Sequence, residues 1–385
     1  MNQNKNQFEL IAKTFFGLED VLAEEITLLG GENIFKHNRA VSFTADKELM
    51  YKCNYRLRTA LRILKPIMKF NVRSTKALYR SVKEYKWEKI FSVDETFAVD
   101  SVVSSEYFKH SKFAALKLKD AIVDRYRAKF GKRPSVDLVN PKVRIHLHIY
   151  NDQCTISLDS SGDSLHKRGY RIAKTIAPLN EALAAGMVML SGWDKESDFI
   201  DPMCGSGTIP IEAALIALDI PPGYLGRLYG FQNWNDFDEK LWKKIESNSS
   251  VKKKININII GSDKSEKAVE AALQNINRAK LTPYINIQRK YFDDQKPQSE
   301  NGIIITNPPY GERLKEDQIF DLYKMIGDTF KTNFTGFDAW ILSAHKTAMK
   351  HVGLKTSKRL TLYNGALECK FHKFSLYKGS KKYKD

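Results

Sequence analysis

The stretch Thr306-Asn-Pro-Pro-Tyr-Gly-Glu-Arg-Leu314 decides the fold of this chain. It follows Ile303-Ile-Ile305, an apolar run that predicts a buried strand of a parallel sheet. Two consecutive prolines end that strand, because proline has no amide hydrogen to give to a neighbouring strand. The sequence therefore predicts a stiff loop at the carboxyl end of a strand, where open α/β sheets bind their ligands.

The chemistry of this loop suits one task, which is holding a planar base that carries a reactive exocyclic amine. Two carbonyl-type oxygens can accept both amine hydrogens while an aromatic ring stacks on the base. The string Asn-Pro-Pro-Tyr is typical of amino-group methyltransferases that act on nucleic-acid bases. We therefore predict four catalytic residues, Asn307, Pro308, Pro309 and Tyr310.

A glycine-rich loop earlier in the chain predicts the cofactor site. The segment 197–201 reads as a short strand, and a helix follows from Ile209 to Leu218. Glycines let the backbone turn tightly and approach a ligand, and the free amides of a helix N-terminus favour an anionic group. Dinucleotide-binding folds share such a loop, but here an Asp precedes the glycines. The predicted cofactor-binding residues of this loop are Asp201, Pro202, Cys204, Gly205, Ser206, Gly207 and Thr208.

Two further acids follow strand-like runs in the same half of the chain. The run 256–263 ends at Asp263, which is placed to accept hydrogen bonds from two ribose hydroxyls. The run 286–292 precedes Asp293, which we predict meets an adenine amine, although an ordinary turn explains this residue equally well. Glycine loop, ribose acid, adenine acid and Asn307 occur in the order that class I S-adenosylmethionine (SAM) methyltransferases use. The predicted cofactor is SAM, with S-adenosylhomocysteine as the product, and Asn307 borders it.

Two motifs carry a closer resemblance: Ser164-Leu-His-Lys-Arg-Gly-Tyr-Arg171 and Ala177-Pro-Leu-Asn-Glu181. The chain resembles the THUMP-domain class I RNA methyltransferases of the YpsC/RlmL type, which are 23S rRNA guanine-N2 methyltransferases, in the form with one methyltransferase domain. The likeness covers nearly the whole chain. It implies an α/β fold in which a ferredoxin-like unit (1–70) and an α/β THUMP RNA-binding domain (71–160) precede a Rossmann-like methyltransferase domain (161–385). It also implies a mostly parallel sheet whose last strand is antiparallel.

Hydrophobic periodicity in the first 160 residues agrees with two small α/β units. The first unit is predicted to have strands at 8–12, 40–44 and 57–72 and helices at 17–29 and 46–55. The second is predicted to have helices at 74–85 and 111–130, a strand at 96–103, and a hairpin of 143–150 with 153–159.

Charge points to a polyanionic partner. The chain of 385 residues carries a formal net charge of +17, and its basic residues are dense between Arg56 and Lys86 and again between Lys112 and Arg133. Such cations can neutralise phosphates, although solvated helix faces would look the same. We predict RNA, either 23S rRNA or a large-subunit precursor, as the partner. The predicted RNA-binding residues are Arg73, Lys76, Arg80, Lys83, Lys112 and Lys119.

Other classes of protein are disfavoured. No apolar run is long enough to span a bilayer and no signal peptide is evident. The four cysteines have no metal-ligand spacing, so we expect no metal site and reduced thiols in a cytoplasmic protein. Cys204 suggests close packing against SAM rather than a nucleophile. No obligate protein partner is evident.

Three further features of the sequence bear on the site or the fold. The aromatic segment 220–255 either walls the target-base pocket or packs on the sheet. His345 is more simply structural than catalytic. Asn364-Gly365 predicts a hairpin between 358–362 and 367–377, which weighs against a nicotinamide enzyme.

Three functions remain in competition. The leading one is SAM-dependent methylation of a guanine N2 amine in 23S rRNA. The second is methylation of adenine N6 in RNA or DNA, since Asn-Pro-Pro-Tyr serves both bases. The third is an RNA-binding assembly factor with a silent methyltransferase fold, which the intact Asp201, Asp263 and Asn307 disfavour.

Overall fold

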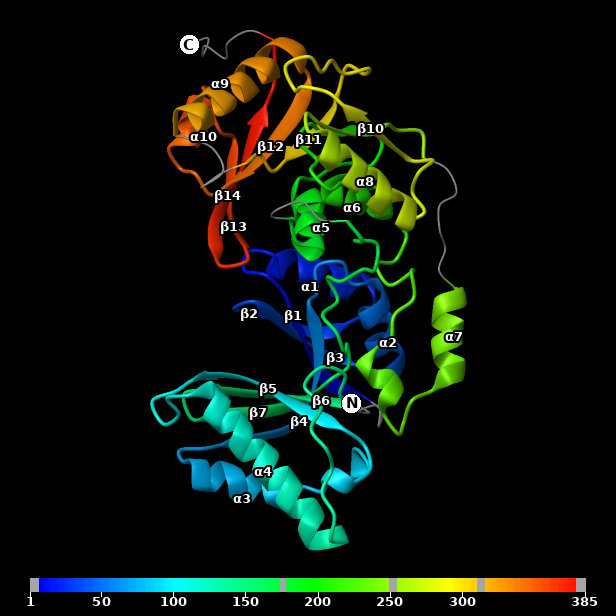
Figure 1. Cartoon of the computed structure of the whole chain (residues 1–385), viewed down its shortest axis with the longest axis vertical. Coiled ribbons are helices and arrows are strands. Elements are labelled where there is room, and N and C mark those ends of the chain that lie inside the picture. Colours follow the sequence, from blue (N-terminus) through cyan, green and yellow to red (C-terminus); the bar gives the residue numbers. More distant parts are fainter. Residues whose placement is uncertain (1–6, 174–177, 249–254, 310–315, 379–385) are drawn as a thin grey trace.

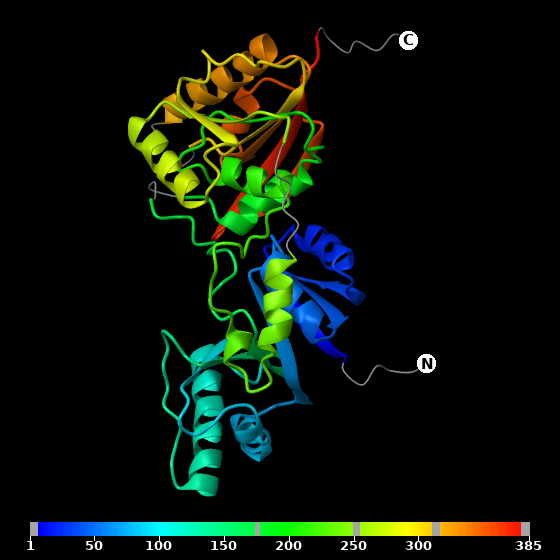
Figure 2. The same cartoon turned by 90° about the vertical axis from the view of Figure 1, so that its right-hand side faces the viewer.

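The computed structural model describes residues 7–173, 178–248, 255–309 and 316–378, and places two seven-stranded sheets in one elongated molecule. Figure 1 shows the second sheet and its helices at one end, and helices α3 and α4 at the other. The first unit of the chain lies between these two ends (Figure 2).

The N-terminal sheet is continuous across the first two predicted units. Its order is β2-β3-β1-β4-β7-β6-β5, and only β5 and β6 are parallel. The strand β4 joins the units, because it pairs with β1 through residues 62–64 and with β7 through residues 64–71. The strands are β1 (Phe8–Lys13), β2 (Glu32–His37), β3 (Ala40–Ala45), β4 (Arg62–Asn71), β5 (Phe97–Ser104), β6 (Val143–Tyr150) and β7 (Gln153–Asp159).

Four helices and a short 3-10 turn accompany this sheet. Two of the helices begin with side-chain caps, where Asp46 and Ser74 accept from the amides of Leu49 and Ala77. The elements are α1 (Glu19–Leu28), α2 (Lys47–Arg56), α3 (Thr75–Glu84), η1 (Trp87–Lys89) and α4 (Ser111–Phe130).

Most predicted elements of this half are confirmed, with two differences. The edge strand β2 was not predicted, because its mostly exposed residues show no alternation of apolar and polar side chains. The predicted strand 57–72 begins only at Arg62. The backbone amides of Arg58 and Thr59 instead donate to the buried carboxylate of Glu25, at 2.6 and 3.1 Å.

The C-terminal sheet has the order β10-β9-β8-β11-β12-β14-β13. All its pairings are parallel except those of β14, which runs antiparallel to both β12 and β13. This confirms the predicted mostly parallel sheet with an antiparallel last strand, and the predicted hairpin turns at Asn364 and Gly365. The strands are β8 (Asp198–Asp201), β9 (Ile259–Asp263), β10 (Ile285–Arg289), β11 (Gly302–Thr306), β12 (Phe337–Ser343), β13 (Lys358–Asn364) and β14 (Leu367–Ser375).

Helices cover both faces of this sheet. The sheet therefore lies between two core clusters, one formed with α5 and α6 and the other with α9. Each face is therefore buried, as a parallel sheet requires. The helical elements are α5 (Glu181–Leu190), α6 (Thr208–Ala217), η2 (Gly230–Asn233), α7 (Glu239–Ser247), α8 (Glu266–Arg278), α9 (Glu316–Asn333) and α10 (Ala348–His351).

The aromatic segment between α6 and β9 belongs to the N-terminal core. Phe231 stacks on Tyr51 of α2 with ring centroids 4.2 Å apart, and Trp242 of α7 meets the same ring edge-on at 6.2 Å. The described part of the segment thus ties the two halves of the chain together. Of the two roles that the sequence left open for this segment, packing is the one that its described residues show, because most of its aromatic side chains lie in the N-terminal core and Ile220 lies in the core of the C-terminal sheet. The lysine run 252–254 lies outside the described residues.

Candidate functional site

The carboxyl ends of four parallel strands bring the predicted site residues to one edge of the C-terminal sheet. In the strand register, Asp201 of β8 lies opposite Gly261 of β9, and Asp263 of β9 lies opposite Arg289 of β10. Asn307 follows directly after β11, which pairs with β8. The structure therefore places Asp201, Asp263 and Asn307 at the same edge, where ligands bind in open α/β sheets.

The glycine loop is fastened to the neighbouring strand β9. The amide of Cys204 donates to the Ser262 carbonyl at 2.9 Å, and the amide of Gly205 donates to the Asp263 carboxylate at 3.1 Å. Gly207 has a φ of +80°, and a Cβ added there would lie 3.2 Å from the Ala272 side chain. These contacts hold the loop as a tight cradle that leads from Pro202 into α6 at Thr208.

Asp201 is the most buried acid of this edge, at 1% exposure. Its pKa is raised to about 8, chiefly by burial and to a smaller extent by the nearby Asp263 carboxylate, while a hydrogen bond from the Met203 amide opposes both effects. A cation beside Asp201 would reverse this shift. Asp263 is only partly buried, and it also accepts from the Ser265 amide at 2.9 Å.

Asn307 offers an oxygen with no hydrogen-bond partner. Its Oδ1 is buried and, within the described ranges, meets no donor. Pro308 is buried behind it and Pro309 is partly buried. An acceptor of this kind at the mouth of a β–α loop fits a ligand that donates hydrogen bonds. Tyr310 lies outside the described residues, so its predicted role is unchanged.

Three other predicted or considered residues have less to do with the site. Asp293 is exposed in a turn four residues beyond β10, because that strand ends at Arg289 instead of continuing to 292. Burial raises the pKa of the Cys204 thiol well above its usual range, which disfavours a nucleophilic thiolate. His345 accepts from the amide of Ala348, the first residue of α10, through Nδ1 at 3.0 Å, which is a structural contact.

Sequence reasoning did not predict a role for Arg171, which donates hydrogen bonds to side chains of the glycine loop. Its guanidinium donates to Ser206 Oγ at 3.3 Å, to Thr208 Oγ1 at 3.0 Å, and to the Glu181 carboxylate at 2.7 Å. A further bond of 2.7 Å goes to the Leu179 carbonyl, and the side chain is only 11% exposed. Its place in the Arg-Gly-Tyr-Arg motif was the only signal in the sequence.

The same motif ties the site to the N-terminal half. Arg168 is buried and donates to the Arg58 carbonyl, while its Nε lies 3.6 Å from the Glu212 carboxylate of α6. The Tyr170 hydroxyl donates to the same carboxylate at 2.9 Å. A buried polar chain thus runs from the first unit of the chain to the helix that follows the glycine loop.

The predicted RNA-binding residues lie on α3, on α4 and, for Arg73, in the turn before α3, and they differ in what they contact. Arg73 pairs with Asp152 at 3.0 Å, Lys119 pairs with Asp120 at 2.6 Å, and Lys83 lies 5.6 Å from the Tyr79 ring centroid. In the part of the chain that the structure describes, Lys76, Arg80 and Lys112 are exposed without a recorded ion pair. Other cations of the basic stretch are structural, since Arg58 is buried and Arg62 pairs with Asp159.

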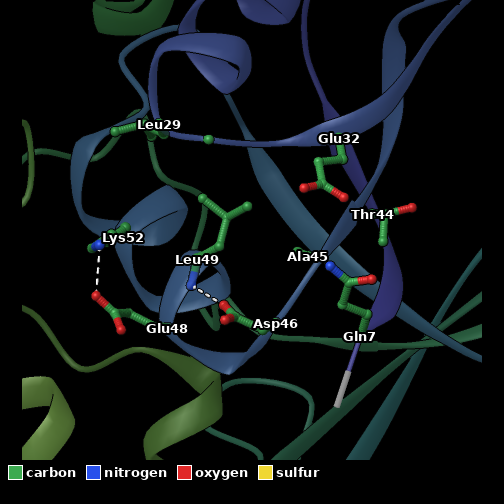
Figure 3. Close-up of a pocket in the computed structure, with 10 residues that line it drawn as sticks. Gln7, Leu29, Glu32, Thr44, Ala45, Asp46, Glu48, Leu49 and Lys52 are labelled. Carbon is green, nitrogen blue, oxygen red and sulfur yellow. Dashed lines mark hydrogen bonds and ion pairs between the residues drawn. The ribbon is translucent and has the colours of Figure 1, made fainter. Parts of the chain in front are cut away.

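A surface hollow on the first unit is unrelated to this edge (Figure 3). Its acids are already occupied, because Asp46 caps α2 and Glu48 pairs with Lys52 at 2.6 Å. Among the described residues, no group of three or more potential metal ligands occurs, and no helix is long and apolar enough to cross a membrane. The hollow is lined by Gln7, Leu29, Gly30, Glu32, Thr44, Ala45, Asp46, Glu48, Leu49 and Lys52.

Three family models match consecutive parts of the chain. Residues 9–64 match the RlmL ferredoxin-like domain, residues 72–159 match the THUMP domain, and residues 168–373 match the RMKL-like methyltransferase domain. The last match covers more than half of the chain.

Similar proteins have matching descriptions. A Synechocystis sp. protein named "Putative RNA methyltransferase slr0064" is 38% identical over 94% of this chain and 95% of its own length. Ribosomal RNA large subunit methyltransferase K/L of Syntrophotalea carbinolica is also 38% identical over 94% of this chain, which spans only 52% of that enzyme. The crystal structure of SMU.472 complexed with S-adenosylhomocysteine superposes with a TM-score of 0.87 at 30% identity, covering 98% of this chain and all of that one.

Proposed function

Because the chain belongs to the family of THUMP-containing, RMKL-like RNA methyltransferases, which use SAM, we propose that it methylates the exocyclic N2 amine of a guanine in 23S rRNA. The observation that supports this proposal is the buried Asn307 Oδ1, which meets no hydrogen-bond partner among the described residues and lies at the same sheet edge as Asp201 and Asp263. It supplies an acceptor for a base amine next to a cradle that fits SAM. We also propose that the ferredoxin-like unit ends near residue 70 and that the THUMP domain ends near residue 160.

We propose one binding partner for each part of SAM. The carboxylate of Asp263 accepts hydrogen bonds from the ribose hydroxyls. The buried Asp201 faces the ammonium group, because burial disfavours its ionised form and a neighbouring cation would stabilise that form. The loop from Pro202 to Thr208 and the first turn of α6 surround the methionine carboxylate. Asp293 remains our proposal for the adenine amine, although it is exposed and would have to be covered by the base.

The chemical step requires positioning more than a strong base. An aryl amine is a weak nucleophile, because its lone pair is delocalised into the ring. Asn307 and the Pro308 carbonyl accept the amine hydrogens and favour a nitrogen whose lone pair points at the methyl group. Tyr310 stacks on the base and keeps it in line with the sulfur. Such alignment supplies much of the acceleration in reactions of this kind.

RNA is the substrate that the N-terminal half supports. The net charge of +17 and the exposed cations of α3 and α4 favour a polyanion, and a paired target base would have to leave its helix. The name of the Syntrophotalea enzyme supports large-subunit rRNA. The alternatives are methylation of adenine N6, because Asn-Pro-Pro-Tyr serves either base, and a silent RNA-binding factor.

The test compares the rRNA of a deletion strain with that of its parent. Nucleoside mass spectrometry of 23S rRNA should show loss of N2-methylguanosine at one site, and the purified protein with SAM should restore it. Loss of N6-methyladenosine would support the second function. Unchanged rRNA, together with SAM binding but no transfer to either rRNA or ribosomal precursors, would support the silent factor.

A further inference from the structure

The N-terminal sheet has two unlike faces. Side chains alternate along each strand, and paired residues in neighbouring strands point to the same side. Ile145 and Leu147 of β6 are buried in one cluster with residues of all four helices α1, α2, α3 and α4. The helices therefore all pack on one face of the sheet. We call the opposite face, which carries His146, His148 and Tyr150 of β6, the open face.

The strand register extends the open face across the sheet. His146 lies opposite Ser157 of β7 and Asp100 of β5. Asp159, two residues from Ser157, lies opposite Leu64 of β4. Lys13 of β1 lies opposite Arg62, two residues from Leu64. This side of the sheet is therefore continuous from β1 to β5. Its middle is buried at Leu64, Ser157 and Asp159, so its accessible residues lie away from the middle.

Exposed rings and apolar groups gather at one end of this face. Tyr150 is 58% exposed and Val102, the partner of His148 on β5, is 52% exposed. Tyr107, 48% exposed, lies in the loop after β5, where Ser105 Oγ bonds the carbonyl of Asn151. Arg73 borders the same end through its ion pair with Asp152. An aromatic platform beside an arginine suits stacked bases and a phosphate.

Cations of the open face exceed the acids that could neutralise them. Arg144 pairs with Asp100 at 3.0 Å, Arg62 pairs with Asp159, and Lys69 pairs with Glu9. These three pairs use the acids that the register places on this face of β1, β5 and β7. Lys13 has no recorded carboxylate partner within the described ranges, and His146 Nδ1 is buried without a hydrogen-bond partner there. Burial lowers the pKa of the Lys13 ammonium, and the nearby positive charge of Arg39 lowers it further.

The geometry points to a binding surface for an unpaired RNA segment on the open face. Tyr150 and Tyr107 stack on bases, and Lys13, His148 and Arg73 contact the backbone. Figure 1 shows α3 and α4 beneath strands β5, β6 and β7, so their open face is turned toward the methyltransferase half of the molecule. The helix-side cations Lys76 and Arg80 lie on the other side of the sheet. This inference rests on the proposed function for the identity of the polyanion.

The test measures binding of a fluorescently labelled single-stranded RNA oligonucleotide, and of its duplex, by anisotropy with the full-length protein. Tyr150→Ala and His148→Ala should each weaken single-strand binding about tenfold. Tyr150→Phe should bind normally, because the ring face acts. Phe130→Ala, which removes a ring of similar exposure (45%) from the end of α4, is the matched control and should change the affinity less than twofold. SAM affinity should be unchanged in all four variants.

Each outcome decides the inference. Normal single-strand binding by Tyr150→Ala and His148→Ala, an equal loss in Phe130→Ala, an equal loss for the duplex, or no single-strand binding by the wild type would overturn it. Methylation is scored separately. If the variants bind and methylate rRNA normally, the open-face inference fails and the proposed function stands. If they lose single-strand binding while the wild type methylates nothing, the surface stands and the proposed function fails.

Discussion

The amide of Gly205 donates to the carboxylate of Asp263 at 3.1 Å, so the glycine loop and the proposed ribose acid form one unit. A second bond to Asp263 comes from the Ser265 amide at the start of α8. The carboxylate is thus oriented before any ligand arrives, which lowers the entropic cost of binding.

This relationship makes Asp263→Ala informative. The substitution should weaken SAM binding by roughly 1–3 kcal/mol, because it removes the acceptor of two ribose hydroxyls and loosens the loop. Calorimetry measures the affinity, and a thermal melt of each protein controls for folding. Asp293→Ala is the comparison, and its smaller effect would agree with its exposure. Wild-type affinity in a folded Asp263→Ala protein would remove the ribose assignment.

The raised pKa of Asp201 predicts proton release. With a pKa of about 8, this carboxyl is mostly protonated at pH 7 in the free protein. An ammonium group beside it favours the carboxylate, so SAM binding should release up to about one proton and tighten as the pH rises toward 8. Calorimetry in two buffers with different protonation enthalpies measures this release. Asp201→Asn should abolish it, whereas a wild-type binding heat that is independent of the buffer would contradict it.

The hydrogen bonds of Arg171 predict a positioning role. Arg171→Ala should weaken SAM binding about tenfold, equivalent to about 1.4 kcal/mol, because Ser206 and Thr208 lose their common donor. Arg171→Lys should recover only part of the affinity, since one ammonium cannot replace the planar fork. RNA affinity should not change. Arg278→Ala, an exposed arginine of α8, serves as the control. Equal SAM affinity in folded Arg171→Ala would exclude the role.

Charge reversal separates RNA binding from cofactor binding. Glutamate at Arg73, Lys76 and Arg80 should weaken binding to structured rRNA fragments and reduce its salt dependence, while leaving SAM affinity intact. The control reverses Lys240, Lys243 and Lys244 of α7, which changes the net charge equally. If both triple variants lose affinity to the same extent, the loss reflects net charge, and Arg73, Lys76 and Arg80 are solvated cations without a specific RNA contact.

The sequence was sufficient to predict which residues lie at the carboxyl ends of the parallel strands in the C-terminal sheet, because strand ends, glycines and prolines are local signals. Asp201, Asp263 and Asn307 lie at one edge of the sheet, while their roles toward SAM and the base stay predictions. The resemblance of the chain to the THUMP-containing methyltransferases is confirmed. Contacts between residues far apart in the sequence could not be predicted from local patterns. Phe231 stacks on Tyr51 across 180 residues of sequence, and only the fold reveals that Arg58 and Arg62 are buried or paired. The aromatic segment therefore completes the N-terminal core, so residues 1–160 alone would lack part of it.

The most direct test of the central claim is methyl transfer by Asn307→Ala. SAM affinity should stay at the wild-type level, because the Asn307 amide is assigned to the target amine, while transfer to 23S rRNA should fall by roughly 100-fold or more. Tyr310→Phe should be mild and Tyr310→Ala severe. Mass spectrometry of the wild-type product should find N2-methylguanosine. Transfer at the wild-type rate by Asn307→Ala, or a wild-type product of N6-methyladenosine, would contradict the account.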